Sequence, residues 1–220
     1  MNWGTLLLVL AAVLVGAAFL WPYLIPDENQ RALQRLNEVL QTWNGVRDLQ
    51  AEVSVLKPGE PALRLTLLYL AGLAVRLEVN EPEELRGEVY ALRAVPEGWL
   101  LVHFRPTLSL GLEARFPAEA LGQILTEFAL LSPTKIRASW PKEDVLWITG
   151  SLGPFAAAEL ELGEIFSLPQ RILLSEAEGG TLEVQVQDLR VNEGLGLRDL
   201  LLFDPLPTRW IRIPIPVGGA

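Results

Sequence analysis

The chain has 220 residues, half of them hydrophobic, and its net charge is −9. It contains no cysteine, which excludes disulfides, thiol chemistry and acylation of an N-terminal cysteine. The acidic balance argues against nucleic acid as a partner, because binding phosphates requires clustered basic residues and here they are scattered singly.

The N-terminal segment, residues 1–26, carries no charged side chain, and every charged residue lies after it. Its apolar stretch 3–25 is long enough to cross a hydrocarbon core of about 30 Å as a helix. Trp3 flanks the stretch on one side, and Trp21 and Tyr23 flank it on the other, as is typical of membrane interfaces. We therefore expect an N-terminal anchor that holds the protein on the outer side of the inner membrane.

A cleaved signal peptide is the alternative, because Gly16-Ala17-Ala18 places small residues after an apolar run. Cleavage would release a soluble periplasmic protein, whereas an anchor would keep it at the membrane. In either case the sequence predicts one exported domain over residues 27–220.

A first amphipathic helix is predicted over residues 27–44. Asp27 stands three residues before Gln30 in a capping-box-like arrangement, and Asn44-Gly45 is expected to end the helix. The apolar residues of this helix recur at helical spacing and are Leu33, Leu36, Leu40 and Trp43. This stripe must pack on another part of the protein.

From residue 49 the apolar residues alternate with a period of two, which predicts successive antiparallel strands separated by turns. The predicted strands before the second helix cover residues 49–55, 63–69, 73–79, 87–93 and 99–105. The predicted strands after it cover residues 135–140, 145–149, 157–162, 168–175 and 181–191.

The second helix is predicted over residues 117–131, with Pro117 at its first position. Its apolar stripe includes Leu121, Ile124, Leu125 and Phe128. The fold class is therefore mainly β with α: a large antiparallel sheet of about nine to eleven strands with two amphipathic helices. A sheet of that size must curl, and the helices are the natural cover for its concave side.

Several predicted strands are apolar on both faces, as in residues 99–104, where only His103 interrupts the run. A sheet with one face in water does not have this pattern. One interpretation is an ordinary core with helices or strands over the second face. The other is a concave face that lines a cavity for an apolar ligand.

In the C-terminal part, an alternating strand over 182–192 ends in Val191-Asn192, and Phe203-Asp204-Pro205 follows. This pattern resembles the closing strand and tail of LolA-type periplasmic lipoprotein carriers. Upstream, Val75-Arg76-Leu77-Glu78 is similar to the Phe-Arg-Trp-Glu strand of the family. Gly98-Trp99-Leu100 is similar to its Asp-Gly-x-x-Leu-Trp hairpin. The helix that begins at Pro117 is similar to its Pro-leading helix, and the motifs occur in the family's order.

This resemblance implies an unclosed half-barrel of about eleven strands, with a helical lid over a hydrophobic cavity that holds acyl chains. The residues that would line this cavity are Leu67, Tyr69, Val75, Leu77, Trp99, Leu101, Leu121, Ile124, Leu125 and Phe128, and those of the lid helix are Leu33, Leu36, Leu40 and Trp43. The chain departs from the family at Leu70-Ala71-Gly72, where the carriers commonly have Lys-Arg-Pro, so the Arg that helps to hold the lid shut is absent.

The sequence gives little support for a catalytic or metal-binding site. We expect neither enzymatic activity nor a cofactor nor a bound metal. The single histidine, His103, lies in an apolar strand, where a structural role is favoured over that of a general base or metal ligand. Carboxylate pairs such as Glu159/Glu161 and Glu176/Glu178 are interpreted as solvated charge.

The function predicted from the sequence is that of an exported lipid- or lipoprotein-binding protein, a carrier or chaperone for acylated ligands in the cell envelope. Two alternatives stay open on the same fold. One is a membrane-anchored periplasmic sensor or regulator that binds lipid or a partner protein. The other is an envelope assembly protein whose concave face holds only its own helices.

Overall fold

A computed structural model of the protein describes residues 38–39, 41–117, 137–152, 155–165, 167–201 and 207–213. The predicted anchor 3–25 lies outside these ranges, as do the predicted second helix after Pro117 and most of the first helix. Residues 38, 39 and 41–43 are helical and a turn follows, which confirms the C-terminal end of the first helix. Within the described ranges, no helix is both long and apolar enough to span a membrane.

Within the described ranges, twelve strands form a single sheet. The first six strands are β1 (Asp48–Leu56), β2 (Leu63–Leu70), β3 (Ala74–Glu81), β4 (Val89–Val95), β5 (Gly98–Arg105) and β6 (Leu110–Phe116). The other six are β7 (Arg137–Ser139), β8 (Val145–Leu152), β9 (Phe155–Leu162), β10 (Pro169–Glu176), β11 (Thr181–Val191) and β12 (Arg209–Ile213). The short helices are the 3-10 turns η2 (Glu83–Leu85) and η3 (Pro106–Leu108) and the α-helix α4 (Leu197–Leu201).

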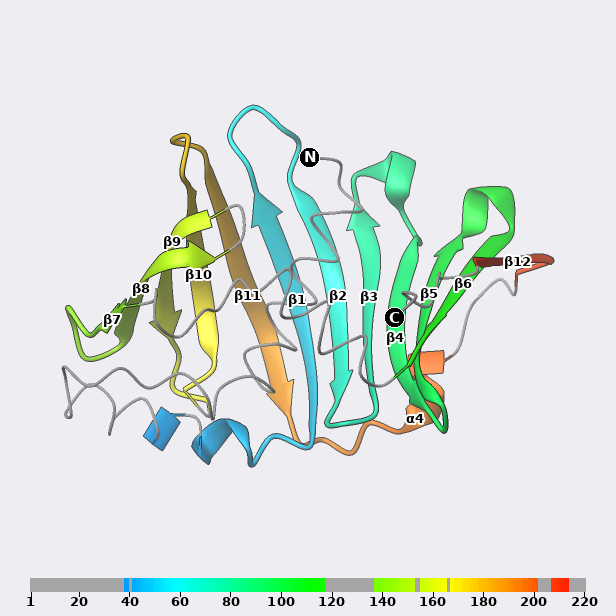
Figure 1. Ribbon diagram of the computed structural model, residues 1–220, viewed down its shortest axis with the longest axis horizontal. Coiled ribbons are helices and arrows are strands. Elements are labelled where there is room, and N and C mark those ends of the chain that lie inside the picture. Colours follow the sequence, from blue (N-terminus) through cyan, green and yellow to red (C-terminus); the bar gives the residue numbers. More distant parts are fainter. Residues whose placement is uncertain are drawn as a thin grey trace, which may run out of the picture.

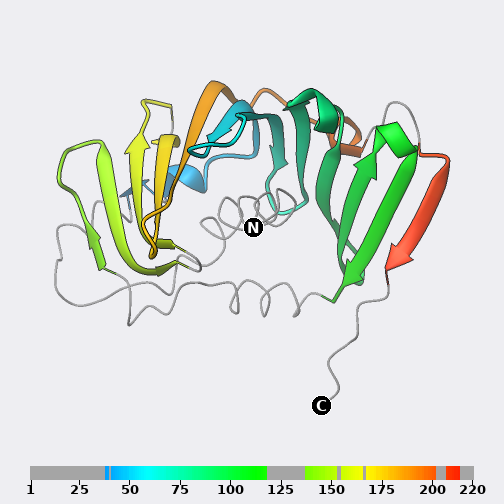
Figure 2. The same cartoon turned by 90° about the horizontal axis from the view of Figure 1, so that it is seen from above.

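The strands follow the order β12-β6-β5-β4-β3-β2-β1-β11-β10-β9-β8-β7, so β12 and β7 are the edges of an unclosed sheet. Neighbouring strands are antiparallel except β12, which is parallel to β6. The sheet bends into an arch, as seen from above in Figure 2, and Figure 1 shows β1 and β11 side by side near its centre. The predicted large, unclosed antiparallel sheet is confirmed, although it has twelve strands, and β6, β12 and α4 were not predicted.

One face of the sheet contains the main hydrophobic core. Val53 on β1 pairs with Leu65 on β2 and with Val186 on β11, and Leu65 pairs with Val79 on β3. Paired residues of adjacent strands point to the same side, so these side chains share a face. We call this face, which also contains Ile172 and Leu174 of β10, the inner face.

The opposite, outer face is largely polar over β1 to β3 and over β9 to β11. Thr66 Oγ1 donates to Glu52 Oε1 at 2.9 Å, and Asn80 Nδ2 donates to Glu52 Oε2 at 3.0 Å. These cross-strand hydrogen bonds satisfy polar groups on the solvent side of three adjacent strands.

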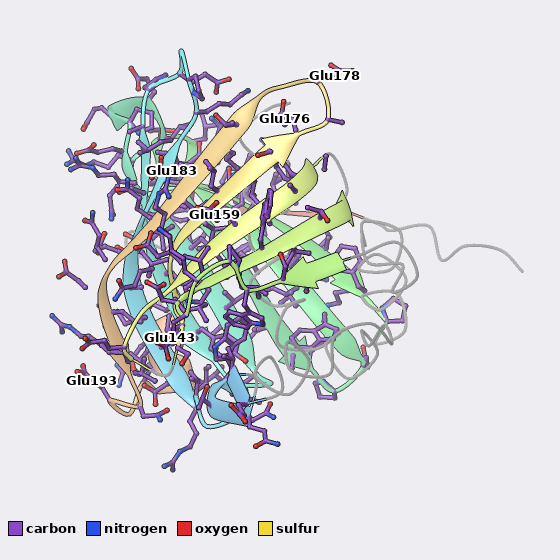
Figure 3. The ribbon with its side chains drawn as sticks, turned by 90° about the vertical axis from the view of Figure 1, so that its left-hand side faces the viewer. Glu143, Glu159, Glu176, Glu178, Glu183 and Glu193 are labelled. Atoms are coloured by element: carbon purple, nitrogen blue, oxygen red, sulfur yellow. The ribbon has the colours of Figure 1, made fainter. Side chains whose placement is uncertain are left out.

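Acidic side chains are frequent on the outer face near β9 to β11, as Figure 3 shows for Glu159 and Glu183. Arg171 on β10 lies between them, with Nε 2.6 Å from Glu183 Oε1 and Nη1 3.8 Å from Glu159 Oε1. The hydrogen bond from Arg171 holds the pKa of Glu183 below its usual value. Glu159 and Glu161 lie within strand β9, and Glu159 lies beside this cation, which offsets its charge.

The outer face becomes apolar over β4 and β5. The residues buried there are Val89, Ala91, Leu100, Val102 and Phe104. Because Trp99, Leu101 and His103 of the same strand point to the inner face, β5 is apolar on both sides. The second hydrophobic cluster, on the outer face, thus explains why residues 99–104 are apolar on both sides of the strand.

A polar clamp joins the start of β1 to the end of β11. The buried Asp48 carboxylate accepts hydrogen bonds from the backbone N–H groups of Glu193 at 2.9 Å and Gly194 at 3.2 Å. Asn192, at φ +60°, accepts from the Arg47 N–H at 2.7 Å and donates to the Gly45 carbonyl at 3.0 Å. After the clamp the chain runs past the lower strand ends in Figure 1 to α4, which contacts β2 and β3 and buries Leu200.

Candidate ligand-binding face

The six sheet residues predicted to line a cavity share the inner face. Tyr69 pairs with Val75, Val75 pairs with Leu92, and Leu92 pairs with Leu101 across β2 to β5. Leu67 and Leu77 form the next pair along β2 and β3, and Trp99 lies two residues before Leu101 on β5. The register therefore brings Leu67, Tyr69, Val75, Leu77, Trp99 and Leu101 to one side of the sheet.

These six residues differ in exposure. Leu67, Val75 and Leu77 are buried and belong to the main core, whereas Tyr69, Trp99 and Leu101 are half-buried. Burial raises the pKa of the Tyr69 phenol, since the charged form loses hydration there.

Along one row of paired residues, the inner face becomes more accessible toward the β12 edge. Leu77 is buried on β3 and pairs with the half-buried Tyr90 on β4, and Leu112 on β6 is also half-buried. Ile211, paired with Leu112, is 38% exposed. An apolar surface thus emerges from the core at this end of the sheet.

The predicted lid residues are only partly within the described chain. Leu33, Leu36, Leu40, Leu121, Ile124, Leu125 and Phe128 lie outside the described residues. Trp43 is described and half-buried, and its Nε1 donates to the Ser167 carbonyl at 3.0 Å. This bond ties the end of the first helix to the loop between β9 and β10.

A polar cluster around the buried Glu88, which directly precedes β4, interrupts the inner face. Its Oε2 accepts from the Tyr90 hydroxyl and contacts His103 Nε2, both at 3.0 Å, and its Oε1 accepts from Arg105 Nε at 2.8 Å. The Tyr90 and His103 rings stack with centroids 4.3 Å apart. Burial and the Glu88 carboxylate both raise the pKa of Tyr90. This geometry supports a structural role for His103.

Strands β6 and β12 extend the inner face with residues that were not among the predicted site residues. Leu110, Leu112, Ala114 and Phe116 face inward, paired with residues of β5, and Arg209 and Ile211 continue the face on β12. The sequence does contain the alternation typical of a strand at β6, because these apolar residues alternate with Gly111, Glu113 and Arg115. The parallel β12 follows a proline-rich tail and had no comparable signal.

In the part of the chain that the structure describes, no three His, Asp or Glu side chains come together as possible ligands of a metal.

No protein-family model and no curated protein matches the sequence. Solved structures do match the fold. An uncharacterized conserved protein from Thermus thermophilus matches with a TM-score of 0.59 and 17% identity, covering 84% of this chain and 100% of that chain. At this identity the similarity shows the fold alone.

Two other matches have lower TM-scores. The LolA superfamily protein from Nitrosomonas europaea matches with a TM-score of 0.40 and 13% identity over 76% of this chain and 97% of that chain. The Pseudomonas aeruginosa MucA/MucB complex matches with a TM-score of 0.49 and 15% identity over 78% of this chain and 61% of that chain. The matching structures also include a putative outer membrane lipoprotein-sorting protein domain from Vibrio parahaemolyticus.

Proposed function

We propose that this protein is an exported lipid- or lipoprotein-binding protein that holds acyl chains against the inner face of its sheet, and that it is not an enzyme. The observation that carries the proposal is the mainly apolar inner face, whose core residues on β1 to β3 are buried and which becomes exposed toward Ile211 on β12. A face that served only as core would be covered along its whole length.

Acyl chains are suited to such a face because binding then depends on apolar area rather than on specific polar contacts. Each methylene taken out of water contributes about 0.8 kcal/mol, so roughly ten of them contribute about 8 kcal/mol. Association and ordering cost about 4 kcal/mol or more, so one or a few chains give useful affinity. The inner residues of β5 and β6 supply the required surface.

The sequence resemblance to LolA-type carriers supports a role as carrier or chaperone for acylated ligands in the cell envelope. An N-terminal anchor at 3–25 would hold the protein at the outer side of the inner membrane. Cleavage of that segment would instead give a carrier that diffuses through the periplasm. Intact-mass analysis of the native protein distinguishes the two: a mature chain that begins near Phe19 would contradict the anchor.

The binding proposal is tested with a fluorescent fatty-acid probe and an Ile211→Glu variant of the full chain. A charge at this partly exposed position repels an apolar tail, so affinity for the probe should fall about tenfold, or about 1.4 kcal/mol. Ile211→Leu should bind normally. Arg212→Gln, on the same strand but with its side chain on the outer face beside Glu113, should also bind normally.

Mass spectrometry of organic extracts from the gently purified protein identifies the natural ligand. Acyl lipids in the extract would support the proposal. An extract without lipid, together with equal probe binding by the Ile211→Glu variant and the wild type, would overturn it and favour a sensor or an assembly protein.

A further inference from the structure

The inner face has one charged row at its end. Glu88 contacts Arg105 on β5, Arg105 pairs with Leu110 on β6, and Leu110 pairs with Arg209 on β12. Residues that pair across strands point to the same side of a sheet. Glu88, Arg105 and Arg209, which we call the charged row, therefore line the same end of the inner face, with Leu110 between the two arginines.

The rows next to the charged row are mainly apolar. The adjacent row consists of Tyr90, His103, Leu112 and Ile211, the next of Leu92, Leu101 and Ala114, and the last of Ala94, Trp99 and Phe116. Successive rows are about 7 Å apart, since two residues of a strand span that length. The inner face of β4, β5, β6 and β12 is thus amphipathic along the strand direction. The charged row lies at one end of these strands, and apolar rows follow it.

The charged row has an excess of positive charge. Glu88 is buried and neutralises one arginine, since its carboxylate accepts from Arg105 Nε. Arg105 is still 40% exposed, and among the described residues its terminal nitrogens have no acceptor. Arg209 is exposed, and its side chain has no acceptor within the same described ranges. Two arginines against one carboxylate give this row a net charge of about +1, on a protein whose total charge is −9.

We propose that the charged row binds the anionic headgroup of a lipid, a phosphate or carboxylate held between Arg105 and Arg209, while the acyl chains lie along the apolar rows. This inference rests on the function proposed above and adds the class of lipid to it. Guanidinium groups bind phosphate and carboxylate through paired, charge-assisted hydrogen bonds. Arg105 and Arg209 are two strands apart, about 10 Å between backbones, so both long side chains can reach one anion across Leu110.

Glu88 has two effects in this arrangement. Its bond to Nε fixes the Arg105 guanidinium and leaves the opposite edge for a ligand. Its negative charge also weakens the attraction of that site for anions. Replacing Glu88 by Gln should therefore increase affinity for an anionic headgroup, which a merely structural role for Glu88 would not predict.

The test compares two lipids with identical fluorescent acyl chains, one with a phosphate headgroup and one with a neutral glycerol headgroup, bound to the full chain. The wild type should prefer the phosphate-bearing lipid. Arg209→Gln, at an exposed position that should not disturb folding, should lower affinity for that lipid about tenfold and leave the neutral lipid unchanged. The matched control, Arg212→Gln, removes a charge from the opposite face of β12 and should bind both lipids like the wild type.

The outcomes distinguish a failure of the headgroup site from a failure of the proposed lipid-binding function. If the wild type binds both lipids equally and Arg209→Gln has no effect, the headgroup site is wrong although lipid binding stands. If neither lipid binds, the proposed function itself is wrong. If inorganic phosphate alone binds in an Arg209-dependent way but does not compete with the phosphate-bearing lipid, the site is one for a free anion, which also overturns the headgroup inference.

Discussion

At the scale of single residues, buried polar groups fix the geometry of this sheet where apolar packing does not. Asp48, Arg76 and Glu88 are buried. Asp48 receives its hydrogen bonds from a backbone turn, and Glu88 receives them from Tyr90 and Arg105. Such groups stabilise one arrangement only, because each loses its partners if the strands shift.

The Asp48 clamp leads to a first prediction. Asp48→Ala leaves the N–H groups of Glu193 and Gly194 without acceptors, so the free energy of unfolding should fall by about 2 kcal/mol. Asp48→Asn retains an acceptor oxygen and should lose less. Denaturant unfolding measures both, with the exposed Glu178→Ala as control, expected within about 0.5 kcal/mol of wild type. A similarly small effect for Asp48→Ala would show that the clamp does not contribute to the free energy of unfolding.

Tyr90 leads to a prediction about alkaline pH. Burial and Glu88 raise its pKa above the ordinary value of 10.0, so the folded protein holds the phenolic proton more tightly than the unfolded chain does. The stabilisation is complete below about pH 10 and decreases as pH rises toward the folded-state pKa, because the unfolded chain deprotonates first. Wild type should therefore lose more unfolding free energy than Tyr90→Phe between about pH 9 and about pH 11.

Denaturant unfolding at both pH values provides the comparison. Tyr69, whose pKa burial also raises, is present in both proteins and contributes equally to each. Equal losses in wild type and Tyr90→Phe would contradict the assignment.

At the scale of elements, the parallel strand β12 depends on a close approach to β6. A Cβ added at Gly111 would lie 2.5 Å from Cε3 of Trp210, so only glycine leaves room for this ring on the outer face. The same pairing places Arg209 and Ile211 on the inner face. Gly111 therefore helps to position Arg209 and Ile211 at the β12 edge of the inner face.

We expect Gly111→Ala to displace the Trp210 ring and loosen β12, at a cost of about 1 kcal/mol because the ring is partly exposed. Hydrogen exchange of residues 209–213 should become faster. The double variant Gly111→Ala/Trp210→Ala should recover slow exchange. Gly196→Ala is the control, since the nearest atom, Asp199 Oδ2, would lie 3.5 Å from its Cβ. Unchanged exchange in Gly111→Ala would contradict the role of this contact.

At the scale of the whole molecule, the twelve described strands form one sheet that joins two halves of the chain. β1 pairs with β2 on one side and β11 on the other, so the strands before and after the predicted second helix meet at the centre of the arch (Figure 1). The main core spans this junction. The exposed apolar surface lies toward the β12 edge, away from the centre of the core.

We predict that the segments 27–44 and 117–131 act as a lid over the inner face. The Arg that helps to hold the lid shut in LolA-type carriers is absent, so the lid should open readily. Hydrogen exchange in both segments should slow when an acyl-chain probe is added, because the ligand favours the closed form. Exchange that stays the same at saturating probe would contradict a lid, and the exchange of β1, which should not change, serves as control.

The sequence by itself determined the strands with a clear period of two, because alternation needs only local chemistry. It also determined that Leu67, Tyr69, Val75, Leu77, Trp99 and Leu101 lie on apolar strand faces, and the structure places them on one face. Only the tertiary structure decided which apolar residues are core and which remain accessible, since that depends on the elements packed against each strand.

The charged row could not be predicted for the same reason. Glu88, Arg105 and Arg209 come from separate segments, and only the register of β4, β5, β6 and β12 aligns them. A shift of one residue in any of these pairings would move an arginine to the outer face, because side chains alternate along a strand. Register results from the packing of the whole sheet, which no local pattern of residues encodes.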